Sequence, residues 1–171
     1  MKERNSTIPI NQEEIASYLK DVRRLKVMTP ERERELADRM LSGFLTETEV
    51  DEIKKELLEG NLRFVITVAK QYQNQGLDLP DLIAEGNYGL LKAIENFDWS
   101  KRLRFISYGV WWVRQSILQS LNENARTIRL PVNVVQELHK AKKDLDANGV
   151  ELPTKFHNLP FTVGLDNPVN E

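Results

Sequence analysis

Four aromatic rings lie close together in the stretch RFISYGVWWVRQSILQSL, residues 104–121. Phe105, Tyr108, Trp111 and Trp112 fall within eight positions, and arginines lie on both sides of them. Aromatic rings stack on unpaired nucleic-acid bases for roughly 1–3 kcal/mol per base, while nearby cations hold the phosphates. The stretch therefore has the side-chain types of a surface for single-stranded nucleic acid, although basic aromatic helices also occur in protein interfaces.

A helix through this stretch would have two different faces. At about 100° per residue, one aliphatic stripe forms, which predicts the core face. The stripe consists of Ile106, Val110, Val113, Ile117 and Leu121.

The opposite face would carry Trp111, Tyr108 and Gln115, and an amide such as that of Gln115 can read a base edge. Phe105 and Trp112 fall on the flank, where packing against neighbouring helices is the favoured interpretation.

Positive charge is concentrated in the same part of the chain. Residues 101–143 carry 9 basic and 2 acidic side chains, a net charge of +7, although the whole chain has a net charge of −2. The aromatic rings alternate with Lys101, Arg102, Arg104 and Arg114. A basic block between acidic ones indicates a face that binds a polyanion, and the alternative is a solvated helical face.

Little in the sequence favours an enzyme. The chain has no cysteine and only two histidines, which are far apart, and it has no glycine-rich phosphate loop. Asp78, Asp81 and Glu85 could be read as a metal cluster, but helix capping and partner contacts explain them better. We therefore expect no catalysis, cofactor or metal. Without a signal peptide or an apolar span, we expect a cytoplasmic protein that does not enter a membrane.

The apolar spacing predicts an all-α protein whose helices position these side chains. Thr29 and Pro30 mark a helix start, and Gly60–Asn61 is a candidate break in a long helix. Gly86 and Gly89 would share one helix face and permit close approach of another helix. Residues 126–131 are expected to be extended, and a further helix is expected over 132–146.

Several stretches together resemble the sigma-70 family, the bacterial initiation factors that give RNA polymerase its promoter specificity. Four stretches resemble region 2 and the start of region 3, in order and spacing. They are NLRFVITVAKQY, GLDLPDLIAEGNYGLLKAIENFD, RFISYGVWWVRQSILQSL and ARTIRLPVN. IASYLKDVRRLKVMTPERERELADRMLSG resembles region 1.2. The pattern ISY…WW.RQSILQ is similar to housekeeping-type sigma factors of Bacteroidota.

The resemblance implies two partners. One is core RNA polymerase, whose largest subunit would bind through its clamp helices to a segment of this chain. That segment comprises Asp81, Leu82, Ile83, Glu85, Asn87 and Leu91, where the two glycines would let the partner helix come close.

The second implied partner is promoter DNA, through the non-template strand of the −10 element. Tyr108 matches a ring that stacks on a flipped adenine, and Trp111 and Trp112 match the pair at the upstream edge of the bubble. Gln115 matches a reader of the −12 pair. The full set of implied DNA contacts is Asn61, Lys101, Arg102, Arg104, Phe105, Ile106, Ser107, Tyr108, Trp111, Trp112, Gln115, Leu118, Gln119, Arg126, Arg129, Asn133 and Gln136.

Some of these positions depart from the family pattern. Leu103 replaces an aromatic residue, Leu118 a threonine and Ile106 a serine. Asn133 and Gln136 stand where histidine and glutamate read the extended −10 element. These departures predict a somewhat different promoter preference.

The expected organisation is a flexible N-terminus over 1–11, regions 1.2 and 2 over 12–123, the start of region 3 over 124–148, and an irregular tail over 149–171. No region 4 follows, which leaves open a truncated or a minimal sigma factor. The resemblance implies an initiation factor that recognises and melts the −10 element and associates with the nucleoid within the holoenzyme. The alternative is a sigma-like regulator that binds polymerase, an anti-sigma or an auxiliary factor without opening promoters.

Overall fold

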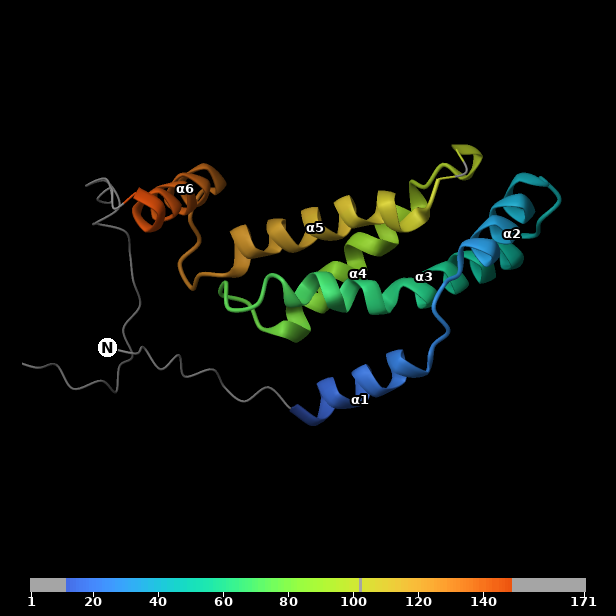
Figure 1. Ribbon diagram of the computed structural model, residues 1–171, viewed down its shortest axis with the longest axis horizontal. Helices are drawn as coiled ribbons and strands as arrows, with labels where there is room; N and C mark the ends of the chain where they lie inside the picture. The colour runs from blue at the N-terminus through green and yellow to red at the C-terminus, as the bar shows by residue number, and fades with distance from the viewer. Residues whose placement is uncertain (1–11, 102, 149–171) are drawn as a thin grey trace, which may run out of the picture.

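The computed structural model describes residues 12–101 and 103–148, and within these residues all regular secondary structure is helical (Figure 1). The predicted all-α fold class is confirmed. Our expectations for residues 1–11, Arg102 and residues 149–171 lie outside the described residues. The helices are α1 (Gln12–Arg24), α2 (Pro30–Leu41), α3 (Glu47–Lys70), α4 (Leu79–Glu95), the 3-10 helix η1 (Trp99–Lys101), α5 (Phe105–Asn124) and α6 (Val132–Asn148).

Local side chains set the starts of α2 and α3. The Thr29 hydroxyl accepts a hydrogen bond from the backbone N–H of Arg32 at 3.3 Å, and Pro30 opens α2, as predicted. At α3 the Thr46 N–H donates to the Glu49 carboxylate at 2.8 Å, and the Glu49 N–H donates back to the Thr46 hydroxyl at 3.4 Å. This reciprocal capping box satisfies two donors that the helix itself cannot.

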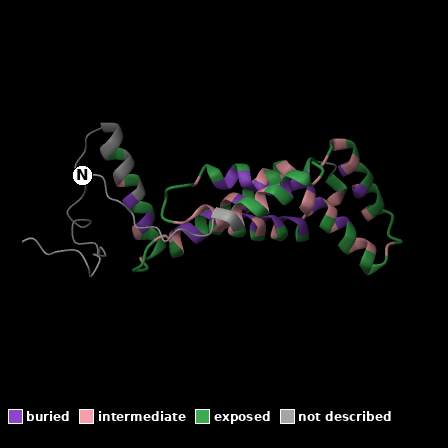
Figure 2. Cartoon of the chain, turned by 90° about the horizontal axis from the view of Figure 1, so that it is seen from below, coloured by how far each residue is buried: buried purple, intermediate pink, exposed green. Residues whose placement is uncertain are grey.

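Three long helices form the centre of the molecule. The most extensive helix contact is between α4 and α5, followed by that between α3 and α4. Helix α2 packs near the start of α3, α1 lies beside α3, and α6 lies beyond the end of α5 (Figure 1). In Figure 2 the buried residues follow the inner sides of the long helices, and the outer sides are mostly exposed.

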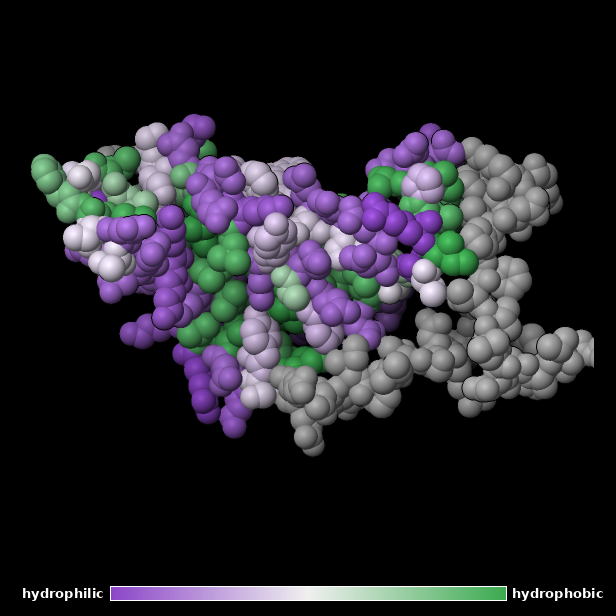
Figure 3. Space-filling view, turned by 180° about the vertical axis from the view of Figure 1, so that it is seen from behind, coloured by the Kyte–Doolittle hydropathy of each residue, from purple (hydrophilic) through white to green (hydrophobic). Residues whose placement is uncertain are grey.

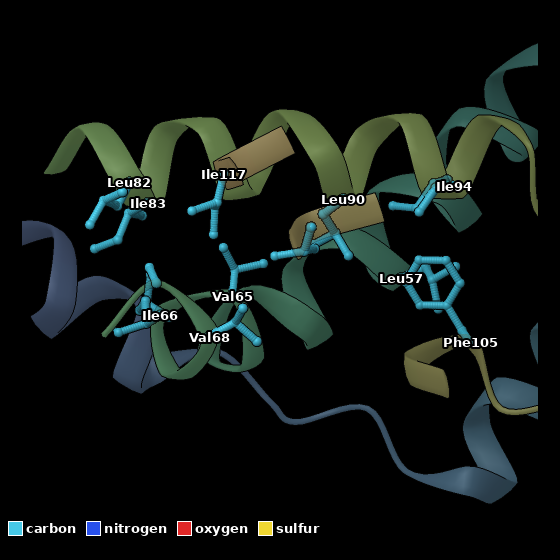
Figure 4. Packing of buried hydrophobic residues seen from close by; sticks show 14 of the residues in the cluster. Leu57, Val65, Ile66, Val68, Leu82, Ile83, Leu90, Ile94, Phe105 and Ile117 are labelled. Carbon is cyan, nitrogen blue, oxygen red and sulfur yellow. The ribbon is translucent and has the colours of Figure 1, made fainter. Parts of the chain in front are cut away.

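The core comes from the facing sides of α3, α4 and α5. Figure 4 shows Val65 pointing between Ile117 of α5 and the leucines of α4, with Phe105 closing one end. Of the aliphatic stripe predicted on α5, Val113, Ile117 and Leu121 are buried as expected. Ile106 and Val110 are only partly buried, because the Phe105 ring fills the core at the start of the helix.

The two glycines of α4 permit close helix packing, as predicted, but the neighbours belong to this chain. A Cβ atom on Gly89 would lie 2.6 Å from the Trp112 carbonyl oxygen of α5. One on Gly86 would lie 2.6 Å from Val65 Cγ1 of α3. Our expectation that these glycines admit a helix of the polymerase is therefore wrong, since α3 and α5 already occupy that face.

The candidate break at Gly60–Asn61 is also wrong, because α3 continues through it to Lys70. Gly60 is required for packing instead. A Cβ atom there would lie 2.9 Å from Met28 Cβ, and the Met28 N–H donates to the Gly60 carbonyl at 3.2 Å. The segment between α1 and α2 thus crosses α3 at the glycine. The predicted break in the helical structure before Pro131 is confirmed, since residues 125–131 are not helical, but the chain bends over residues 125–128 and is not extended there.

Candidate nucleic-acid interface

Trp111 points outward from the bundle, as the helical wheel predicted. Its side chain is 70% exposed, whereas Val113, two positions later, is fully buried. Around the indole lies a groove of about 480 Å³ between the outer face of α5 and the start of α6. We call this the α5 groove, and it is lined by Trp111, Arg114, Gln115, Leu118, Gln119, Asn122, Glu123 and Val132.

The α5 groove combines the chemistry needed to hold a nucleotide. The indole offers a flat apolar face, the two glutamines offer donors and acceptors, and Arg114 contributes positive charge. The Arg114 Nε atom is buried and has no hydrogen-bond partner within the described chain. Leu118 is 44% exposed and adds an apolar wall where a threonine would have added a hydroxyl.

Tyr108 does not share the outward direction of Trp111, so that part of the wheel prediction is wrong. Its ring is partly buried against the core and lies 5.7 Å from the Phe97 ring, centroid to centroid. Its hydroxyl donates to the Asn96 carbonyl at 3.1 Å. The reason is tertiary, because the segment after α4 covers this flank of α5. Trp112 lies on the same flank, 6.2 Å from Tyr108 and partly packed, as predicted.

Phe105 and Asn61 are not open to a base. The Phe105 ring is 1% exposed and meets the Phe97 ring edge-on at 5.1 Å. Asn61 is 5% exposed, and its amide donates to the Leu57 carbonyl at 2.7 Å. The prediction that these two side chains contact DNA directly is therefore wrong for this conformation, because both belong to the interior. Packing in the core was the favoured interpretation for Phe105, and that is confirmed.

The cations near the start of α5 are already paired. Lys101 lies 3.4 Å from Asp98, and the Arg104 Nε atom lies 2.9 Å from a Glu33 carboxylate oxygen. The pKa of Asp98 is lowered, chiefly by hydrogen bonds from the side chain and backbone of Ser100 and then by Lys101. Both cations remain substantially exposed, so each can also face a phosphate.

The remaining predicted contacts lie near the two ends of α5 and on α6. Ser107 is exposed and Ile106 is partly buried in the first turn of α5. Arg126 and Arg129 are exposed between α5 and α6, and Asn133 and Gln136 are exposed on α6. The structure brings Trp111, Gln115, Leu118 and Gln119 together in one groove.

Helix α4 divides the predicted polymerase-binding residues between two faces. Leu82 and Ile83 are 0% and 4% exposed, so their assignment to a docking surface is wrong and they are core residues. Asp81 and Leu91 are exposed, and Glu85 is partly exposed. The Asn87 amide donates to the Tyr18 hydroxyl of α1 at 3.1 Å.

The outer face of α4 carries one further aromatic residue that the sequence did not single out. The Tyr88 side chain is 53% exposed, and the Lys92 ammonium group lies 4.3 Å from its ring centroid. The helical spacing of residues 81, 84, 88 and 91 could have indicated this apolar and acidic stripe.

Two features at the start of α5 were also missed. Glu33, which lies in the first turn of α2, is 6% exposed and contacts both Arg104 and the backbone of Phe105. Phe97 supports Tyr108 and lines a cavity between α2 and the α4–α5 connection, together with Trp99 and Leu103. These contacts join residues far apart in the sequence, so spacing could not have revealed them.

Within the described residues, no cluster of three or more histidine, cysteine or acidic side chains could hold a metal ion. Asp78 is the N-cap residue of α4 by position, although its side chain makes no capping hydrogen bond. Nor is any described helix long and apolar enough to cross a bilayer.

Fold and site together define an all-α protein with an aromatic, amide-lined groove on the outer face of α5. Residues 57–127 match the family described as Sigma-70 region 2. The chain is 41% identical over 126 residues to the RNA polymerase sigma factor SigA of a Bacillus species, covering 74% of this chain and 32% of that protein. It is 40% identical over 126 residues to SigA of Clostridium acetobutylicum, with the same shares covered. This chain belongs to the sigma-70 family, and it spans about a third of the length of these relatives.

Proposed function

We propose that this chain is a transcription initiation factor that binds core RNA polymerase and captures the non-template strand of the −10 element. Family membership supports the proposal, and the two relatives are named RNA polymerase sigma factors. The single observation that carries it is Trp111, a 70% exposed indole beside two glutamines on a helix whose opposite face buries Val113 and Ile117. A large exposed ring in such a rigid setting is typical of a binding site.

Strand capture can use binding energy alone. Flipping a base out of the duplex costs a few kcal/mol, and stacking returns roughly 1–3 kcal/mol for each base held on a ring. In our proposal Trp111 supplies the stacking face and Gln115 reads the adjacent base pair. Arg126 and Arg129 hold the phosphates upstream, so the melted state is favoured once both strands are parted.

The surface proposed for polymerase is the outer face of α4. Asp81, Glu85 and Leu91 stay in this surface, and Tyr88 replaces the buried Leu82 and Ile83 as its apolar contribution. Because α5 packs against the other side of α4, the two partners can bind at the same time.

The proposal is tested by the affinity of the core polymerase complex for a fluorescent −10 non-template oligonucleotide. Trp111→Ala should weaken binding about 5- to 150-fold, the loss expected from one stacked base. The matched control is Phe44→Ala, which truncates a 95% exposed aromatic ring where α2 meets α3. Figure 3 shows apolar side chains exposed at that end of the molecule. Equal affinities of the two variants would refute a stacking role for Trp111.

Polymerase binding is tested separately by co-purification. Reversing charge in Asp81→Lys with Glu85→Lys should abolish recovery of core polymerase, because the proposed surface would become positive. The matched control reverses two exposed acids of α3, Asp51→Lys with Glu52→Lys. A chain that binds polymerase but not the −10 strand would instead act as a polymerase-bound regulator.

A further inference from the structure

One buried carboxylate joins α2 to the beginning of α5. Glu33 is only 6% exposed and accepts a hydrogen bond from the Arg104 Nε atom at 2.9 Å. Its second oxygen accepts a hydrogen bond from the backbone N–H of Phe105. Glu33 and Arg104 are 71 positions apart in the sequence, so this contact belongs to the tertiary fold.

The carboxylate supplies a cap that α5 lacks locally. The first N–H groups of a helix have no partner within the helix, and α2 and α3 satisfy some of theirs with Thr29 and Thr46. The N-cap residue of α5 is Arg104, whose side chain makes no capping bond. Glu33 takes over this function from another helix, and its negative charge suits the positive end of the α5 dipole.

The start of α5 holds Arg104, an exposed cation that can face a phosphate, and packs against the aromatic rings that support Tyr108. The Phe105 ring packs edge-on against Phe97, and Phe97 in turn lies 5.7 Å from the Tyr108 ring. The Arg104 side chain is 47% exposed and uses only Nε in the pair, so its two terminal nitrogens remain for a phosphate. Moving this turn would displace both a ring and a cation.

We propose that Glu33 is a positioning residue for strand capture. Its carboxylate holds the first turn of α5 and directs Arg104 toward the DNA backbone, although Glu33 itself touches no nucleotide. The inference rests on the proposed function, since it assigns a role in binding the −10 strand.

The sign of the effect separates positioning from simple electrostatics. Removing an acidic side chain raises the net charge by one, which by itself strengthens the attraction of DNA. Positioning predicts the reverse for Glu33. The matched control is Glu35→Ala, on the same helix, which makes the same charge change at an exposed residue paired with Arg32.

The test measures binding of the core polymerase complex to the −10 oligonucleotide. Glu33→Ala should weaken affinity about fivefold, the ratio expected for a lost cap, and Glu35→Ala should not weaken it. Glu33→Gln keeps an oxygen for the Phe105 N–H and should recover part of the loss. Arg104→Ala should cost less in the Glu33→Ala background than in the wild type, because the two residues act together. Affinity of Glu33→Ala equal to or tighter than that of Glu35→Ala would overturn the inference.

A second measurement does not depend on DNA. Amide hydrogen exchange of the full-length chain should be faster at Phe105 in Glu33→Ala and unchanged in Glu35→Ala. Unchanged exchange in both variants would overturn the capping role. If the wild type binds no −10 strand, the proposed function fails and the strand-capture role of Glu33 fails with it, while exchange still decides whether Glu33 sets the first turn. Should Glu33→Ala not fold, Glu33→Gln is compared with Glu35→Gln by the same criteria.

Discussion

Replacement of Gly89 by alanine tests whether close contact between α4 and α5 holds the bundle together. The added methyl group would lie 2.6 Å from the Trp112 carbonyl oxygen, 2.9 Å from Ser116 Cβ and 3.0 Å from Val113 Cα. Two of these three atoms are backbone, so no side-chain rotation relieves the overlap. The helices must therefore separate along the most extensive interface of the fold.

The expected magnitude follows from two opposing effects. Overpacking of a core costs about 1–3 kcal/mol, and the backbone contacts place Gly89 near the upper end of that range. Alanine in a helix interior recovers about 1 kcal/mol relative to glycine. The free energy of unfolding of Gly89→Ala should thus fall by about 2 kcal/mol.

Gly109 of α5 provides the matched control. It also lies inside a helix at the same interface, but a Cβ atom there would meet nothing closer than Phe105 Cζ at 3.4 Å, an ordinary contact distance. Gly109→Ala should therefore raise the free energy of unfolding by about 0.5–1 kcal/mol. Urea unfolding followed by circular dichroism measures both variants. If Gly89→Ala proves as stable as Gly109→Ala, close approach of the two helices does not limit stability, and the packing argument fails.

Three further predictions concern the faces, the helix start and the charge. Phe105→Ala should lower the free energy of unfolding by about 3–5 kcal/mol, whereas Trp111→Ala should change it by less than about 0.5 kcal/mol. If urea unfolding shows an equal loss of stability in both variants, the buried and exposed faces of α5 are assigned wrongly. The pKa of Glu49 is lowered from 4.5 by hydrogen bonds from the backbone and side chain of Thr46. The stabilising contribution of the Glu49 carboxylate is present above about pH 4.5 and is lost as the pH falls through the lowered pKa. Glu49→Gln should therefore lose less stability in acid than the wild type does. Identical acid titrations of the two proteins would contradict this prediction. Binding of −10 DNA should weaken steeply with added salt, and a flat response would remove the phosphate role of residues 101–143.

The parts of the fold that depend on local sequence were predictable. Helical periodicity placed Val113 and Ile117 in the core and Trp111 outside, and the structure confirms all three positions. Thr29 and Pro30 marked the start of α2 because capping uses atoms only a few residues apart. The two α4 glycines were correctly expected to permit close approach, since a shared face follows from spacing alone.

Several of the errors arise from tertiary contacts that the periodicity of one helix does not contain. Tyr108 faces away from the aliphatic stripe on the wheel, yet Phe97 and Asn96 cover it because the chain turns back after α4. Gly60 reads locally as a break, but its missing side chain accommodates Met28. Glu33 has the spacing of a first-turn acid of α2, and only the folded chain brings it to α5. Periodicity within one helix contains no information about which neighbour will cover its flank.

The packing of α4 on α5 also constrains how the two proposed surfaces work together. Gly89 brings the α4 backbone against the α5 backbone at Trp112, next to the exposed Trp111. On the other side of α4, Tyr88 and Leu91 are exposed for a partner. Interiors packed this closely transmit displacement rather than absorb it. A polymerase that binds the outer face of α4 would therefore hold the strand-binding face of α5 in a fixed position, and a variant that separates the helices should weaken both interactions together.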